Sequence, residues 1–199
     1  MNTKAFTMIE LIVVIVVTGI LLINILPRLE RDDLRIATEQ IIRHIRYTQH
    51  IAMVNDVYDA TKPLWFKAMW RISFRSNNCY VVSSNTDFDM NYDRNESAED
   101  PLDKRLLYSN NKCIQIASDN SNMFLSDQYQ IDSIEFNSAC GDNRFIAFDH
   151  MGRPHKTLTK VNDLLSSKCT ITLSSGLRAG VIEIHPQTGY VKVISLDEM

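Results

Sequence analysis

The side chains that could catalyse a reaction or bind a metal ion are scattered along this chain. Its five histidines are His44, His50, His150, His155 and His185. They form no H-E-x-x-H motif, and the chain has neither a nucleophile elbow nor a phosphate-binding loop. Its carboxylates form no recognisable catalytic pair. The sequence therefore predicts that the protein is not an enzyme, and it indicates neither a cofactor nor a metal site.

One polar stretch nevertheless has the alternation of a calcium-binding loop. Oxygen-bearing side chains recur at every second position, at Asp87, Asp89, Asn91, Asp93 and Asn95. Arg94 stands where such a loop needs a glycine when the count begins at Asp89, and no glutamate closes the loop at the right distance. Two interpretations stay open, a calcium loop and a solvated surface loop. These mismatches favour the surface loop.

The cysteines are expected to form two disulfides. They stand at Cys79, Cys113, Cys140 and Cys169. All of them follow the apolar N-terminal stretch, and they lack the C-x-x-C spacing of a metal site. In an oxidising compartment such cysteines pair. Three connectivities are open, and Cys79–Cys113 with Cys140–Cys169 is favoured because the shortest loops close most readily.

The apolar stretch from Phe6 to Leu26 sets the organisation of the chain. Its only charged side chain is Glu10, and its 21 helical residues would extend about 30 Å, the thickness of a bilayer's hydrocarbon core. We therefore expect a membrane-spanning helix whose short leader, with Lys4, lies on the cytoplasmic side. A carboxylate in that setting needs a partner. A cleavable signal peptide and a plain membrane anchor are the alternatives. Small residues do not follow the apolar core as a signal peptide requires, and a plain anchor gives no reason for Glu10.

The pattern after Pro27 is that of an amphipathic helix. Apolar or small side chains recur at steps of three and four residues, at Leu34, Ala37, Ile41, Ile45, Thr48 and Ala52. Proline loosens or kinks a helix at this place. We therefore expect one long helix from about Phe6 to Asn55, half in the membrane and half packed on a core.

From Leu64 onward the hydrophobic period changes to two, which predicts strands. Expected strands lie at residues 69–75, 79–82, 113–117, 131–136, 145–148, 169–173, 181–185 and 190–194, the last two joined by a turn at Pro186–Gly189. A helix followed by strands indicates an α+β fold, with an antiparallel sheet packed on the apolar stripe of the helix. The expected divisions are a leader (1–5), a transmembrane and assembly helix (6–27), its amphipathic continuation (28–55) and a β-rich head (56–199).

The N-terminal residues Lys4–Ala5–Phe6–Thr7–Met8–Ile9–Glu10–Leu11 resemble the class III signal of type IV pilins and type II secretion pseudopilins. The resemblance implies that prepilin peptidase cuts between Ala5 and Phe6 and that the new N-terminal Phe6 is N-methylated. It also implies that Glu10 pairs with the N-terminal amine of a neighbouring subunit. Gly19 and Pro27 stand where many pilins have a Gly and a Pro around a loosely wound part of the helix. Ala5 departs from the glycine that the family has before the cut.

Two stretches nearer the C-terminus resemble the GspH/FimT minor pilins. One is Phe145–Pro154, with the pattern F-D-x-x-G-R-P, and the other is the hairpin around Thr188–Gly189. The resemblance implies a minor pilin or pseudopilin that is incorporated into, or primes, a type IV pilus or a secretion pseudopilus. The implied partners are other pilins, prepilin peptidase and an inner-membrane assembly platform. The implied location is a single pass through the bacterial inner membrane with a periplasmic head, and later a filament in the cell envelope.

A DNA-binding receptor on the same scaffold is the alternative function, because some FimT-like pilins bind DNA through arginines near the C-terminal hairpin. The candidate contacts here are Arg153, Arg178 and Lys192. Residues 141–199 contain seven cations and six anions, a net charge of +1. So small a charge favours phosphate binding little unless the cations converge in space.

Overall fold

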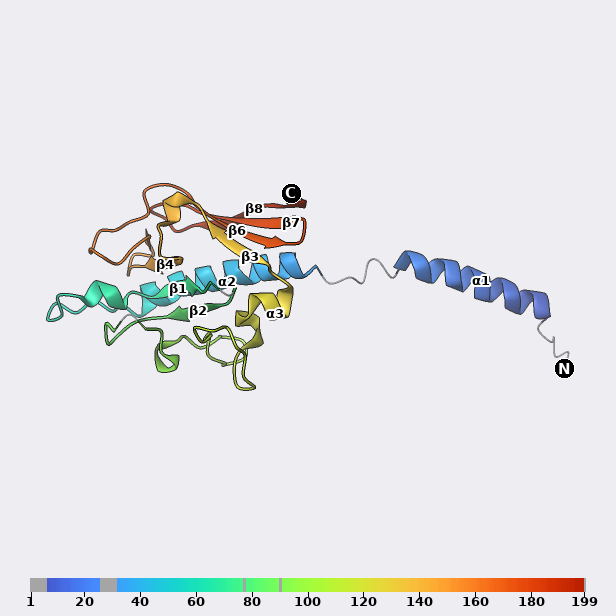
Figure 1. Cartoon of the computed structure of the whole chain (residues 1–199), viewed down its shortest axis with the longest axis horizontal. Coiled ribbons are helices and arrows are strands. Elements are labelled where there is room, and N and C mark those ends of the chain that lie inside the picture. Colours follow the sequence, from blue (N-terminus) through green and yellow to red (C-terminus); the bar gives the residue numbers. More distant parts are fainter. Residues whose placement is uncertain (1–6, 26–31, 77, 90, 199) are drawn as a thin grey trace. The chain divides into compact units, whose positions relative to one another are not determined.

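The computed structural model describes residues 7–25, 32–76, 78–89 and 91–198 (Figure 1). These residues belong to two compact units, one that ends at Asp32 and one that begins at Asp33. The first unit contains helix α1 (Met8–Ile25), and the second contains helix α2 (Asp33–Val54) together with all the strands. The fold is α+β.

The expected long helix from Phe6 to Asn55 is wrong. The structure describes two helices that belong to different units, and α2 begins at Asp33. Asp33 lies in the first turn of α2, where a carboxylate interacts favourably with the helix dipole. The amphipathic segment therefore forms a helix of its own within the head.

The expected single pass through the inner membrane is also wrong. Helix α1 has 18 residues, which at 1.5 Å each extend about 27 Å, and Glu10 in its first turn shortens the uncharged part further. In the part of the chain that the structure describes, no helix has both the length and the apolarity needed to cross a bilayer.

The head consists of α2 and two four-stranded sheets, in each of which neighbouring strands are antiparallel. The first sheet has the order β2 (Tyr80–Ser83), β1 (Arg71–Phe74), β4 (Phe145–Phe148), β5 (Pro154–His155). The second has the order β3 (Ser133–Phe136), β6 (Cys169–Ser175), β7 (Arg178–Ile184), β8 (Val191–Glu198). Short helices complete the head: α3 (Leu125–Tyr129) and four 3₁₀ turns at Trp65–Ala68, Arg94–Glu96, Ser121–Met123 and Ser138–Cys140.

Helix α2 packs against strands of both sheets (Figure 1). All six positions of its expected apolar stripe are buried, and Ile41 and Ile45 at its centre are fully buried. They belong to one core cluster that also includes Ile72 of β1, Ile146 of β4 and Ile182 of β7. The periodicity of α2 therefore predicted its buried face correctly, although not that two sheets would share it.

Most expected strands are present, with shifted ends. Residues 113–117 are the exception, since they form turns and irregular backbone. Ile114 and Ile116, which suggested a half-buried strand, are both exposed, and Cys113 has a positive φ of 53°. Strand β1 also differs from its alternating pattern, because all four of its residues are buried. Its second face is covered by an additional apolar cluster that contains Phe66, Phe145 and Leu158.

The disulfides are Cys79–Cys113 and Cys140–Cys169, the pairing that the shortest loops favour. Each joins a buried position of the head to a segment of irregular backbone or a turn. The first ties the irregular segment that begins at Cys113 to the start of β2, and the second ties the turn at Ser138–Cys140 to β6. Both therefore restrain segments that regular strand pairing does not hold.

Gln49 of α2 connects the two C-terminal motifs. Its side-chain nitrogen Nε2 donates to the carbonyl of Gly152, at 2.7 Å, and to that of Thr188, at 2.8 Å. Gly189 fits beside it with a φ of +64°, and a Cβ there would lie 2.8 Å from the Gly152 carbonyl oxygen. The G-R-P turn and the T-G turn are thus held together by one amide of the helix.

We predict that Gly189→Ala destabilises the head by about 2–4 kcal/mol, because the added methyl displaces Gln49 and overpacks the turn. Gly176→Ala is the matched control: its φ is +57°, but nothing lies within 4 Å of a Cβ there. That variant should cost only the left-handed backbone strain, about 1 kcal/mol. Urea unfolding of both variants measures the difference, and equal losses would contradict the role of the close packing.

Candidate functional site

Helix α1 is a candidate assembly surface because its apolar side chains are uncovered. Ile12, Val13, Val14 and Ile15 are 52%, 55%, 51% and 62% exposed. Four consecutive helical residues point to all sides of a helix, since each is turned by about 100° from the last. The described part of α1 is therefore apolar and exposed around its whole circumference.

Thr7 caps the start of α1. The backbone nitrogen of Glu10 donates to Thr7 Oγ1 at 3.4 Å, and the Thr7 hydroxyl donates to Glu10 Oε2 at 3.5 Å. The threonine oxygen thus satisfies one of the amide groups that a helix start leaves unpaired, and the T-x-x-E pattern predicts such a cap. Glu10 thus has a local structural role that the sequence pattern could have revealed. Its expected pairing with a neighbouring subunit stays a prediction.

The other N-terminal site residues are only partly described. Gly19 lies on α1, and a Cβ added there would meet no atom within 4 Å, so the space beside this glycine is unoccupied among the described residues. Thr18 beside it donates back to the carbonyls of Val14 and Ile15. Ala5, Phe6 and Pro27 lie outside the described residues.

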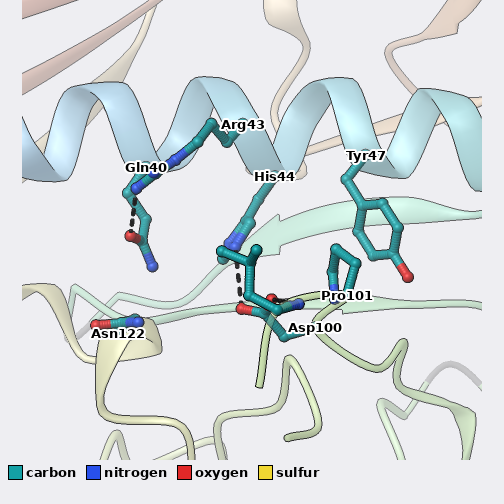
Figure 2. Close-up of a pocket in the computed structure, with 8 residues that line it drawn as sticks. Gln40, Arg43, His44, Tyr47, Asp100, Pro101 and Asn122 are labelled. Atoms are coloured by element: carbon teal, nitrogen blue, oxygen red, sulfur yellow. Dashed lines mark hydrogen bonds and ion pairs between the residues drawn. The ribbon is translucent and has the colours of Figure 1, made fainter. Parts of the chain in front are cut away.

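A pocket of about 340 Å³ lies where α2 faces the loop after residue 99 (Figure 2). Gln40, Arg43, His44 and Tyr47 line one side, at the spacing that places residues on one helix face. Asp100, Pro101, Leu102 and Asn122 line the other side. This pocket was not expected from the sequence, because Asp100 and His44 lie 56 positions apart and no motif relates them.

His44 is the buried centre of this pocket. Its Nδ1 lies 2.8 Å from the hydroxyl of Tyr80, and its Nε2 lies 3.8 Å from Asp100 Oδ2. Burial lowers the pKa of His44 to about 4, although the Asp100 carboxylate acts in the opposite direction. Burial also raises the pKa of Tyr80 well above its ordinary value. At neutral pH both groups are uncharged. A neutral imidazole that carries its proton on Nε2 can accept a hydrogen bond from the Tyr80 hydroxyl at Nδ1.

The lining of this pocket does not form a catalytic set. None of its lining residues is a serine, threonine or cysteine that His44 could activate as a nucleophile. Both His44 and Asp100 are nearly fully buried. Their arrangement fits a buried polar contact that fixes the loop against α2.

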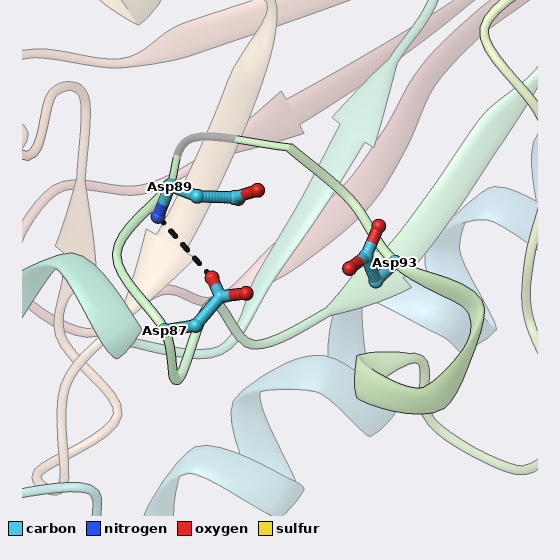
Figure 3. Close-up of side chains that lie close together, drawn as sticks. All are labelled: Asp87, Asp89 and Asp93. Atoms are coloured by element: carbon cyan, nitrogen blue, oxygen red, sulfur yellow. Dashed lines mark hydrogen bonds between the residues drawn. The ribbon is translucent and has the colours of Figure 1, made fainter.

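The acidic loop brings three of its five alternating residues together (Figure 3). Carboxylate oxygens of Asp87, Asp89 and Asp93 lie within 4.8 Å of one another, and all three residues are exposed. The backbone and side-chain nitrogens of Asn91 already donate to the two oxygens of Asp89, at 2.7 and 2.6 Å. These internal hydrogen bonds explain the loop's shape without a cation.

The three cations of the DNA hypothesis all make interactions within the chain. Lys192 Nζ on β8 lies 3.5 Å from Glu183 Oε1, and Arg153 Nε lies 2.8 Å from Asp149 Oδ2. Arg178, at the other end of β7 from Glu183, also makes an interaction within the chain. Asp149 pairs with Arg153, whereas Glu183 is shared, since its Oε1 lies 3.2 Å from Lys168 Nζ as well as 3.5 Å from that of Lys192. These carboxylates reduce the positive charge that the cations offer to phosphate groups.

Asp149 organises the turn that the F-D-x-x-G-R-P pattern forms. Its carboxylate accepts hydrogen bonds from the backbone nitrogens of Met151 and Arg153, from Arg153 Nε and from His155. Burial by itself raises the pKa of Asp149, but these hydrogen bonds outweigh it and hold the pKa well below the usual range. The motif is therefore explained by turn structure.

We predict that the head loses about 3 kcal/mol of stability as the pH falls from about 6.5 to about 4, because His44 is protonated more readily in the unfolded chain. The folded pKa is the lower one, so this stability is fully present above pH 6.5 and is lost as the pH falls through 4. Urea unfolding as a function of pH measures it. His44→Gln should flatten this part of the profile relative to the parent chain, while His50→Gln, an exposed position on α2, should leave it unchanged. A parallel profile for His44→Gln would contradict the prediction.

Comparison of the chain with family models, with curated proteins and with solved structures found no match.

Proposed function

We propose that this chain is a minor subunit of a pilin-like filament, a minor pilin or pseudopilin, in which α1 packs against the apolar helices of neighbouring subunits. The observation that carries the proposal is the exposure of α1 on all sides. A helix that is apolar all round is stable when other apolar groups surround it. Fully burying one valine or isoleucine side chain is worth about 1.5–3 kcal/mol, so bundling several such helices supplies a large driving force.

The N-terminal sequence supports the same proposal. Residues 4–11 resemble a pilin processing signal, with the cut between Ala5 and Phe6. Glu10 is five positions into the chain that such a cut would leave. In that chain the new amine and the Glu10 carboxylate have opposite charges. A pair between the amine of one subunit and the carboxylate of the next would fix the axial register of a bundle, because few other charges occur on these helices.

The organisation of the head suits a subunit that is carried by such a helix. Among the described residues, its main core cluster is formed by side chains of the second compact unit, and two disulfides tie that unit together. We propose no catalytic step, and the carboxylates beside Lys192 and Arg153 do not favour the DNA-receptor alternative.

We predict that Glu10→Gln and Glu10→Ala both reduce incorporation into filaments at least tenfold, because each removes the carboxylate. Glutamine keeps a side-chain oxygen that can accept the hydrogen bond from the Thr7 hydroxyl, as glutamate does. Thr7→Ala is the complementary variant: it removes the cap but keeps the charge, and it should be incorporated nearly normally. Immunoblots of sheared filaments against whole cells measure incorporation. Glu39→Ala, an exposed glutamate on α2, is the matched control.

The results separate the charge from the cap. Normal incorporation of Glu10→Gln together with loss of Thr7→Ala would show that capping matters and would contradict the intersubunit pair. Mass spectrometry of the same fractions should find a chain that begins with N-methylated Phe6. If the parent chain never appears in filaments and keeps its first five residues, the filament proposal fails.

A further inference from the structure

The outer face of β1 carries Arg71, and Arg75 follows directly after the strand; both lack protein acceptors for most of their guanidinium nitrogens. The two guanidinium groups lie on the same side of the chain, because both stack on the Tyr92 ring. Arg71 is only 1% exposed, and Arg75 is half-buried. Within the described residues, no protein atom accepts a hydrogen bond from Nε, Nη1 or Nη2 of Arg71, or from Nε or Nη2 of Arg75.

Aromatic rings cover these guanidinium groups but do not satisfy them. The Cζ atom of Arg71 lies 4.6 Å from the centre of the Tyr92 ring and 5.6 Å from that of Phe145, and Arg75 Cζ lies 4.1 Å from Tyr92. A ring face stabilises a cation above it. The N–H groups, however, point outward in the guanidinium plane and require acceptors there.

Further polar groups on this face also lack partners. Ser73 stands between the two arginines on β1, and Ser83 lies opposite Arg71 in the β1–β2 register. Both serines are buried, and neither hydroxyl has a hydrogen-bond partner among the described residues. Asn85, two positions beyond Ser83, is fully buried, and both atoms of its amide lack partners in the same part of the chain. Hydrogen-bond donors therefore outnumber acceptors at this place.

Glu96 is the one carboxylate whose charge acts noticeably on Arg71. Its Oε1 accepts two hydrogen bonds from Thr86, each at 2.6 Å, while its buried Oε2 has no partner among the described residues. Burial lowers the pKa of Arg71, and the Glu96 charge opposes that effect. No ion pair within 4 Å joins the two in the described structure. The loop that carries Tyr92 also holds three exposed carboxylates, Asp87, Asp89 and Asp93, so the two arginines have no surplus of positive charge around them.

We propose that this outer face of β1 binds a small tetrahedral oxyanion, with Arg71 and Arg75 as its two cationic donors and Ser73 and Ser83 as neutral donors. Guanidinium groups recognise the oxygens of phosphate and sulfate through paired N–H groups. A buried cation without an anion is costly, so a bound oxyanion would stabilise the folded chain.

Tyr92 covers this anion site and lies between two exposed residues of its loop, Asn91 and Asp93. The loop carboxylates Asp87, Asp89 and Asp93 are exposed, so water and salt screen their repulsion of an anion over about 8 Å at physiological ionic strength. An anion reaches Arg71 only if the Tyr92 ring is displaced.

Thermal unfolding of the full chain in phosphate, in sulfate and in chloride at equal ionic strength tests this proposal. We expect 10 mM phosphate to raise the midpoint by several degrees over chloride, and ³¹P NMR should show the phosphate line broadened by the protein. In Arg71→Met, which has a similar length but no donors, the rise and the broadening should disappear. Arg46→Gln, an exposed arginine on α2, is the matched control and should keep both.

Two more variants keep the test decisive. Arg75→Gln should weaken phosphate binding about tenfold and carries the test if Arg71→Met does not fold. Glu96→Gln removes the competing carboxylate and should tighten phosphate binding several-fold. Equal midpoints in phosphate and chloride for the parent chain would overturn the proposal. A full phosphate effect in both arginine variants would also overturn it. A Glu96→Gln chain that is less stable than the parent and does not respond to phosphate would overturn it too, because Glu96 would then be the partner of Arg71. A sulfate effect equal to that of phosphate supports a site for tetrahedral oxyanions in general.

Discussion

The packing of α2 against both sheets is the contact on which the head depends. Ile41 and Ile45 are fully buried where the helix meets strands that come from opposite ends of the sequence, β1 and β4 in one sheet and β7 in the other. The apolar inner face of each sheet must be packed against another layer to be removed from water, and the helix provides that layer. Loss of this stripe would expose the inner faces of both sheets at once.

The same helix positions the polar features of the head. Gln49 holds two turns through its amide, and His44 meets Tyr80 and Asp100 in the pocket beside the loop after residue 99. The opposite face of the first sheet is closed by irregular segments, which bring Tyr92 over Arg71. On a strand that is buried on both faces, a charged side chain cannot reach water. Arg71 is unusual because its charge is buried in this way.

Helix α1 has the reverse character. Thr7 caps one of its first amides, but its apolar side chains are exposed on every side in the structure. The filament proposal rests on this uncovered surface, because apolar side chains gain free energy when other apolar groups remove them from water.

The sequence by itself determined the local features: the buried stripe of α2, most of the strands, and a disulfide pairing that loop closure favours. It failed where a feature depends on distant neighbours. The strand expected at residues 113–117 had apolar alternation, but the structure gives it no partner strand. The continuous N-terminal helix was inferred from apolar periodicity, and periodicity does not show where one compact unit ends and the next begins. Only the tertiary structure decided that His44 faces Asp100, that Glu183 lies beside Lys192, and that no acceptor among the described residues bonds the Arg71 guanidinium. These are contacts between residues far apart in the sequence, and periodicity carries no information about which charges a fold brings together.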